Sequence, residues 1–208
     1  MYAPTSEMSS RDAYRLLIGS VLPRPIAWVS TQSADGVPNV APFSFFTAVT
    51  SHPPTLLFSP SHRDGVDKDT LANIRATGDF VVNVVTEDLA EAMNLTSEDL
   101  PRGRSEFEAA GVTPAPARLV KSPRVAESPI SMECRLVQLV DVGQGPSAST
   151  LVIGEVLAWH IRDDMYDAER VHVRFDRLNA VGRLAGDWYS KTRDQFEMIR
   201  PNPNYQGR

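Results

Sequence analysis

IAWVSTQSADGVPNVAPFSFF, residues 26–46, contains two extended runs on either side of a turn. Residues 26–32 have the composition of a strand, and Ser33 to Gly36 supplies turn residues. The second run, residues 37–51, is expected to be extended but interrupted at Pro42, which cannot donate to a regular ladder. The stretch therefore predicts a β-hairpin with an irregular second arm.

Three phenylalanines fall within six residues in APFSFF, residues 41–46. Adjacent aromatic residues in a strand mostly face the core, which is one interpretation of Phe43, Phe45 and Phe46. A strand broken at Pro42 would also free backbone N–H and C=O groups, which could then bind the edge of a planar heterocycle. On that second interpretation, Asn39 and Ser44 add polar side chains to a binding site. Both interpretations stay open at this point.

The rest of the chain has many short strands and few helices. Helices are expected over residues 9–22, 70–77, 87–95 and 106–110, with Gly78 and Gly111 as stop residues. Further strands are expected over residues 55–59, 80–85, 131–142, 149–162 and 171–175. Because strands and helices do not alternate regularly, the pattern favours a mainly β protein, an antiparallel barrel with flanking helices, over a doubly wound sheet.

The connecting segments and the length favour one domain over residues 1–208. Residues 95–107, which include Pro101 and Gly103, are a candidate lid. The proline-rich residues 113–129 are expected to cross the surface, and residues 195–208 form a polar tail.

Composition excludes several classes of protein. The chain has 208 residues and a formal net charge of −5, with acidic and basic residues interspersed, which argues against nucleic acid as a partner. No signal peptide pattern and no run of about 20 apolar residues is present, so we expect a cytoplasmic protein that does not bind membranes. The single cysteine, Cys134, excludes an internal disulfide and is expected to be a small buried hydrophobe.

Common catalytic and metal motifs are missing from the sequence. It contains no dinucleotide fingerprint, phosphate loop, nucleophile elbow or zinc-protease helix motif. The four histidines, His52, His62, His160 and His172, lack ligand spacing and are interpreted as structural or solvated. We therefore expect no metal site and no catalytic histidine.

The sequence KDT, Lys68 to Thr70, begins the helix expected over residues 70–77. A lysine is unfavourable at the positive end of a helix unless a negative group lies beside it. Asp69 meets this need in part as a cap. Alternatively, Lys68 and Thr70 converge with Ser59, Ser61 and Arg63 on a phosphate, which free helix N–H groups favour. A merely solvated Lys68 remains the other interpretation.

Four motifs, in this order, resemble one known family. They are RPIAWVST, DGVPNVAPFSFF, PPTLLFSPS and KDTLANIRATGDFVVNVV, with weaker similarity in EFEAAGV, RVAESPISMEC and VGRLAGDWY. Together they closely resemble the flavin reductase-like family of FMN-binding split-barrel proteins, which includes flavoredoxin-like proteins. The resemblance implies a six-stranded antiparallel split β-barrel, homodimerisation, and FMN bound near the dimer interface.

The resemblance also implies roles for particular residues. The strand beside the flavin corresponds to Trp28, Val29, Ser30 and Thr31, and the segment that binds the isoalloxazine corresponds to Asn39, Ala41, Pro42, Phe43 and Ser44. The phosphate-binding part corresponds to Ser59, Ser61, Lys68, Asp69 and Thr70, with Asn73 and Arg63 as further neighbours. Arg183 and Tyr189 are assigned as flavin or nicotinamide neighbours, although AGDW before the tyrosine is less glycine-rich than the family pattern.

The resemblance implies an FMN-dependent oxidoreductase with NADH or NADPH as co-substrate. In such a protein FMN N5 carries the chemistry and the chain supplies positioning and electrostatics, so no catalytic side chain is expected. The acceptor would be free flavin or another small molecule, and a flavin-dependent monooxygenase is a candidate partner. Two alternatives are a flavoredoxin-like electron carrier with a protein redox partner, and a non-catalytic split-barrel ligand-binding protein.

Overall fold

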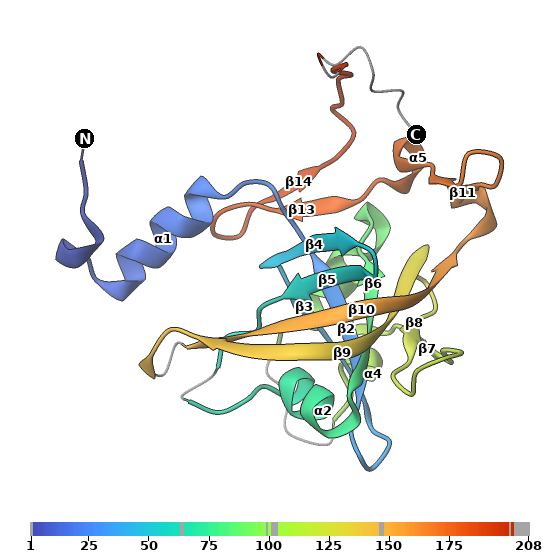
Figure 1. Ribbon diagram of the computed structural model, residues 1–208, viewed down its shortest axis with the longest axis horizontal. Coiled ribbons are helices and arrows are strands. Elements are labelled where there is room, and N and C mark those ends of the chain that lie inside the picture. The colour runs from blue at the N-terminus through green and yellow to red at the C-terminus, as the bar shows by residue number, and fades with distance from the viewer. Residues whose placement is uncertain are drawn as a thin grey trace.

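The computed structural model describes residues 2–62, 65–98, 100, 104–145, 148–199 and 201. Its main element is a seven-stranded antiparallel sheet with the strand order β3-β2-β6-β9-β10-β5-β4 (Figure 1). In chain order these strands are β2 (Ala27–Gln32), β3 (Pro38–Phe43), β4 (Phe46–Ser51), β5 (Pro54–Phe58), β6 (Asp79–Val84), β9 (Ile130–Val142) and β10 (Ser149–Ile161).

The helices and minor strands surround this sheet. The helices are α1 (Ser10–Ser20), α2 (Asp69–Thr77), α3 (Ala90–Leu95), α4 (Glu106–Ala110) and α5 (Phe175–Leu178). Short ladders join β1 (Arg24–Pro25), β13 (Val181–Arg183) and β14 (Tyr189–Lys191), and pair β7 (Pro114–Ala115) with β8 (Arg124–Val125) and β11 (Tyr166–Asp167) with β12 (His172–Val173). Figure 1 shows α1 projecting away from the sheet, toward the N-terminus.

Two residues, Ser44 and Phe45, force the sheet to curl. They are the whole connection between β3 and β4, which lie at opposite ends of the strand order. Three peptide units bring the Cα atoms of Phe43 and Phe46 within about 11 Å of each other. The two sheet edges therefore approach at this connection, as in a split barrel. The expected fold class is confirmed, with seven strands in the main sheet where six were expected.

The expected interruption at Pro42 was wrong, because β3 runs through this residue. Pro42 lies opposite Trp28, and the ladder continues to the pair of Phe43 with Ala27. Since β3 is an edge strand and the Val40 N–H points away from β2 to Glu106, the antiparallel alternation also points the Pro42 nitrogen outward. A proline is tolerated there because no ladder bond is lost. The break occurs instead at Ser44 and Phe45.

An aromatic stack fills the barrel core. The ring centroid of Phe58 lies 5.1 Å from that of Phe43 and 5.4 Å from that of Phe80, and all three side chains are buried. The Phe80 ring lies over Gly154 so closely that a Cβ at this position would overlap it. A second core cluster, around Trp28, Met93 and Phe107, packs α3 and α4 against the other side of the sheet.

Three local expectations need correction. The N-cap of α2 is Lys68, whose side chain makes no capping hydrogen bond, so Asp69 is the first helical residue and not the cap. Residues 113–129 do not simply cross the surface, because they pair β7 with β8 and bury Val125 in the core. The expected strand 171–175 ends at Val173, and Phe175 begins α5.

Cys134 is buried, as expected, and should be chemically inert. Burial raises the pKa of its thiol far above the usual range, and the charge of Glu133 adds to the rise. We predict that a thiol reagent such as dithionitrobenzoate leaves the folded protein unmodified and reacts with one thiol per chain in denaturant. Stoichiometric reaction of the folded protein would contradict this assignment.

Within the described part of the chain, no helix has both the length and the apolar character needed to cross a membrane.

Candidate functional site

A cavity of about 410 Å³ opens between the edge strand β3 and the start of α2. This volume lies within the range typical of cofactor sites. The cavity, called the first cavity below, is lined by Asn39, Ala41, Pro42, Phe43, Val66, Asp67, Lys68, Asp69, Thr70, Thr96, Ser97, Glu98, Leu100 and Glu106. Two segments that the sequence assigned to opposite ends of one ligand thus share a single cavity.

The α2 end of the first cavity suits an anion. The helix begins with an extended N-cap residue, Lys68, and then Asp69 and Thr70 in its first turn. The helix dipole favours negative charge at this end, and the Lys68 ammonium adds a full positive charge. Among the described residues, Lys68 is the cation that lines the first cavity, whereas Asp67, Asp69, Glu98 and Glu106 contribute carboxyls. Anion binding here should therefore depend strongly on Lys68.

The β3 end of the cavity is held by a buried polar network. The Asn39 amide oxygen accepts hydrogen bonds from the hydroxyls of Thr31, at 3.2 Å, and Thr70, at 3.0 Å. The Asn39 amide nitrogen donates to the Glu106 carboxylate at 2.9 Å. Asn73 donates in turn to the Thr31 hydroxyl at 3.0 Å. The network joins β2, β3, α2 and α4, so this wall of the cavity is rigidly built.

A second cavity of about 570 Å³ adjoins the first, because Pro42 and Ser97 line both. It is lined by Tyr14, Ile18, Arg24, Ile26, Pro42, Ser44, Met93, Asn94, Ser97, Arg183, Leu184, Gly186, Asp187 and Tyr189. The Arg183 guanidinium lies 4.5 Å from the centroid of the Tyr189 ring and donates to the Tyr189 hydroxyl, which donates to Asn94 at 3.2 Å. The positive charges of Arg24 and Arg183 suit an anionic ligand.

Arg24 joins three segments at the second cavity. Its guanidinium donates to the backbone carbonyls of Ile18, Val21 and Leu184 at 2.7 to 2.9 Å. Its Nε also lies 3.4 Å from the Ser44 hydroxyl. Arg24 therefore ties the end of α1 and the loop between β13 and β14 to the turn between β3 and β4.

The structure brings some of the predicted site residues together and separates others. The first cavity is lined by Asn39, Ala41, Pro42, Phe43, Lys68, Asp69 and Thr70, and the second by Pro42, Ser44, Arg183 and Tyr189. Asn73 lines a hollow of about 320 Å³ together with Asn39 and Asp69. Trp28, Val29, Ser30, Thr31, Ser59 and Ser61 line none of these three spaces. Arg63 lies outside the described residues, as do positions 99 and 101–103 of the candidate lid and most of the tail after 199.

The strand β2 has a supporting position, not a lining one. The side chains of Trp28, Val29, Ser30 and Thr31 are fully buried. Trp28 reaches the cavity wall only indirectly, through a 2.9 Å hydrogen bond from its indole to the Thr96 hydroxyl. These residues thus hold the backbone against which β3 and α3 are placed.

Two polar residues in the cavity walls, Glu106 and Arg24, are not apparent from the sequence. Glu106 is buried, and it accepts hydrogen bonds from Asn39 and the Val40 N–H. Burial raises the pKa of this carboxyl above its usual range, the hydrogen bonds oppose the rise, and the charge of Asp69 adds to it. An acid in the first turn of a helix is common, so nothing local distinguished Glu106. Its partners Asn39 and Val40 lie 67 and 66 positions earlier in the chain.

Comparison with known proteins gives a consistent result. Residues 18–179 match the family described as Flavin reductase like domain. Nitrilotriacetate monooxygenase component B from Bacillus cereus superimposes with a TM-score of 0.91 at 35% identity, over 95% of this chain and 98% of that chain. The 2-nitrobenzoate 2-nitroreductase NbaA of Pseudomonas fluorescens gives a TM-score of 0.89 at 34% identity, over all of both chains.

A more distant structure shows the same fold. A protein from Shewanella frigidimarina described as a flavin reductase with a split barrel domain has a TM-score of 0.82 at 22% identity, over 96% of this chain and 98% of that chain. At this identity the likeness concerns the fold alone.

Proposed function

Because the chain belongs to the flavin reductase like domain family, we propose that it is an FMN-dependent NAD(P)H oxidoreductase that reduces free flavin or another small acceptor. The observation that carries the proposal is the shared first cavity, which Lys68 at the start of α2 lines together with Asn39, Ala41, Pro42 and Phe43 of β3. A phosphate at one end and a flat ring at the other fit this arrangement.

The residues present fit FMN as follows. Lys68 and the N-terminal end of α2 would hold the phosphate, and the β3 edge with Pro42 and Phe43 would contact the ring. When bound, the flavin supplies the redox chemistry by accepting a hydride equivalent. The chain binds and orients it, so no acid and base pair is required in the cavity.

The second cavity is proposed as the co-substrate site. It adjoins the first at Pro42 and Ser97, and Arg24 and Arg183 provide positive charge for the phosphates of NADH or NADPH. Hydride transfer would require the reacting atoms to lie about 3–3.5 Å apart, so the co-substrate site should adjoin the flavin site, as the second cavity adjoins the first.

The test is anaerobic mixing of the purified protein, loaded with FMN, with NADH or NADPH in separate experiments. We predict that the flavin absorbance bleaches within the mixing experiment and that turnover continues when free flavin is added. Reduction only by another redox protein would instead indicate the flavoredoxin-like electron carrier. A colourless preparation that does not bind added FMN would indicate a non-catalytic ligand-binding protein.

Two relatives suggest different electron acceptors. Similarity to a monooxygenase component B at 35% identity supports delivery of reduced flavin to a flavin-dependent monooxygenase. Similarity to a 2-nitrobenzoate nitroreductase at 34% identity supports a small nitroaromatic acceptor, whose carboxylate Arg24 or Arg183 would attract. Steady-state oxidation of NADH or NADPH with each acceptor decides between them.

We further propose that residues 1–208 form one cytoplasmic domain that acts as a homodimer. In support, α1 projects from the sheet (Figure 1). Tyr14 and Leu17 of this helix are 55% and 51% exposed, and Val21, its C-cap residue, is 53% exposed. An apolar helix face of this kind is typical of a surface that a partner covers. Sedimentation equilibrium of the whole chain should give twice the chain mass.

A further inference from the structure

The Glu106 carboxyl is buried in the wall of the first cavity, where the proposed function uses no acid. Its side chain belongs to the first residue of α4 and the residue is 7% exposed. A buried carboxyl is costly unless it is hydrogen-bonded. Here Oε2 accepts from the Asn39 amide at 2.9 Å and from the Val40 N–H at 3.4 Å.

The bond to Glu106 helps to fix the orientation of the Asn39 side chain. The amide nitrogen points to Glu106, and the amide oxygen accepts from Thr31 and Thr70. A flipped amide would face Glu106 with an acceptor and the two hydroxyls with donors. Asn39 lines the cavity in which the ring would bind. By holding one N–H of the amide, Glu106 therefore also sets the direction of the second N–H.

Glu106 also decides where the outer edge of β3 is open to a ligand. Antiparallel alternation points the backbone groups of Pro38, Val40 and Pro42 away from β2. The two prolines have no N–H, and Glu106 occupies that of Val40. At these positions a ligand thus meets outward carbonyls and no free N–H, and the segment after Pro42 adjoins the second cavity.

We propose that Glu106 is a positioning residue of the flavin site, which fixes the Asn39 amide and the Val40 segment of β3 against the ring end of the ligand. This inference rests on the proposed function, because it concerns the same cavity. It assigns Glu106 to the ring end of the site, whereas Lys68 belongs to the phosphate end. A role at the ring end must affect flavins with and without a phosphate equally.

The decisive variant is Glu106→Ala, titrated with FMN and with riboflavin. We predict that its affinity for both falls about tenfold, because one charge-assisted hydrogen bond to Asn39 is lost. Glu106→Gln keeps an acceptor for Asn39 and should restore both affinities to within about threefold of the parent protein.

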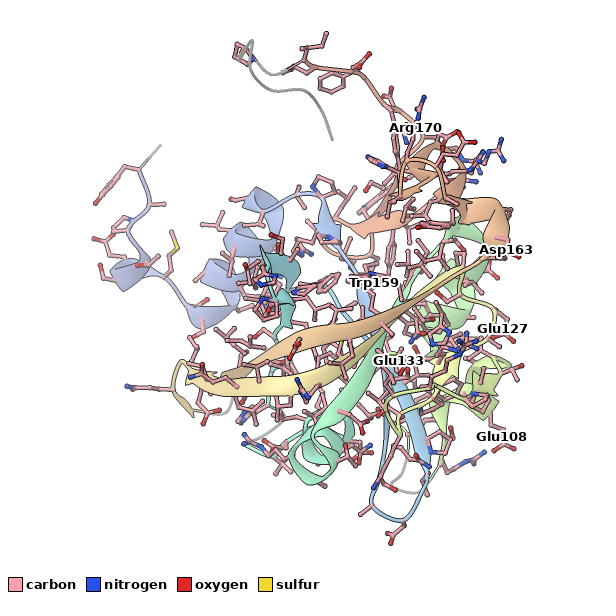
Figure 2. The ribbon with its side chains drawn as sticks, turned by 45° about the vertical axis from the view of Figure 1, so that its right-hand side comes forward. Glu108, Glu127, Glu133, Trp159, Asp163 and Arg170 are labelled. Atoms are coloured by element: carbon pink, nitrogen blue, oxygen red, sulfur yellow. The ribbon has the colours of Figure 1, made fainter. Side chains whose placement is uncertain are left out.

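Glu108 provides the matched control on the same helix. It is exposed and lies at the periphery of the molecule (Figure 2), so Glu108→Ala removes an acid of α4 without touching the cavity. We predict unchanged affinity for both flavins in this variant.

Two measurements separate positioning from a general structural effect. If Glu106 acts through Asn39, then in an Asn39→Ala background the change Glu106→Ala should cost less than about threefold in riboflavin affinity. If the two substitutions instead reduced riboflavin affinity independently, so that their fold-losses multiply in the double variant, this would contradict the assignment. The second measurement is a pH titration of riboflavin affinity, since riboflavin has no phosphate that titrates.

The pH titration has a defined sign. Because burial raises the pKa of Glu106, its carboxylate gains a proton at a higher pH than an exposed one, and the hydrogen bond from Asn39 weakens. Riboflavin affinity should fall about threefold as the pH is lowered through this pKa, and stay flat in Glu106→Gln. The charged groups around the same cavity are Asp67, Lys68, Asp69 and Glu98, with Asp35 and Arg104 in the adjoining hollow, and they are unchanged in both proteins.

The outcomes distinguish this inference from the proposed function. If the parent protein binds neither flavin, the proposed function fails and Glu106 has no ring to position. If the parent protein binds both and Glu106→Ala binds them equally well, only the Glu106 assignment is overturned. A loss limited to FMN would also overturn it. Should Glu106→Ala fail to fold, Glu106→Gln and the pH titration test the same assignment.

Discussion

Replacing Lys68 by alanine is expected to weaken FMN binding about thirtyfold and riboflavin binding less than about twofold. Lys68 is the N-cap of α2 and is the cation that lines the first cavity among the described residues. Four carboxyls line the same cavity, so the loss of Lys68 leaves a phosphate beside negative charge, and among the described residues no other cation lines the cavity to offset it. Riboflavin carries no phosphate, so its affinity should change little.

Titration of the apoprotein with each flavin, followed by fluorescence, measures this difference. Lys121→Ala is the matched control, because Lys121 is exposed and lines none of the three spaces of the site. Raising the ionic strength should weaken FMN binding in the parent protein and have a smaller effect in Lys68→Ala. Equal losses for both flavins would remove Lys68 from the phosphate end.

Replacing Phe58 by alanine should lower the free energy of unfolding by ~3–5 kcal/mol. Its side chain is fully buried between Phe43 and Phe80, with centroids at 5.1 and 5.4 Å. Phe80 is itself pressed against Gly154, and Phe43 ends the strand that lines the site. The neighbours can collapse only partly into the space, so a cavity remains.

Urea unfolding of the apoprotein provides the measurement, since a bound ligand would add its own stabilisation. Phe196→Ala is the control, because this ring is 83% exposed and its loss should change the free energy of unfolding by less than about 0.5 kcal/mol. A loss below ~1 kcal/mol for Phe58→Ala would show that the aromatic stack is not the main packing element of the barrel.

Local signals in the sequence predicted most of the elements. The helix at Glu106–Ala110 and its left-handed stop at Gly111 agree with the structure, as does Gly78 after α2. Both glycines have positive φ, which other residues rarely adopt, so sequence and structure are linked directly there. The long strands β9 and β10 were also predicted within one residue at their ends.

The sequence predictions were wrong where the local structure depends on residues far away in the chain. A proline normally interrupts a strand, but Pro42 is tolerated because β3 has a free edge, and edge position is a property of the whole sheet. Val125 looked like part of a proline-rich surface segment, yet its N–H binds the Asn83 side chain and its own side chain is fully buried. Neither contact can be read from the local pattern.

In the candidate site, too, the sequence identified the segments but not which of their side chains face the cavity. Lys68 and the segment of β3 from Asn39 were assigned from sequence motifs, and the structure places both at one cavity. The motif also included Trp28 to Thr31, whose side chains are buried behind the site and do not line it. Motif resemblance identifies a strand without distinguishing the side chains that face the ligand from those that support it.

The free edge of β3 bears on solubility as well as on binding. An unpaired edge strand ordinarily offers a row of N–H donors to which a strand of another molecule can add, and such addition leads to aggregation. At the three outward positions of β3, Pro38 and Pro42 have no N–H, and the N–H of Val40 is already bonded to Glu106. A foreign strand therefore finds no donor to pair with at these positions. The two prolines and the bond from Val40 to Glu106 thus leave this edge accessible to a small ligand and protect it from pairing with a strand of another chain.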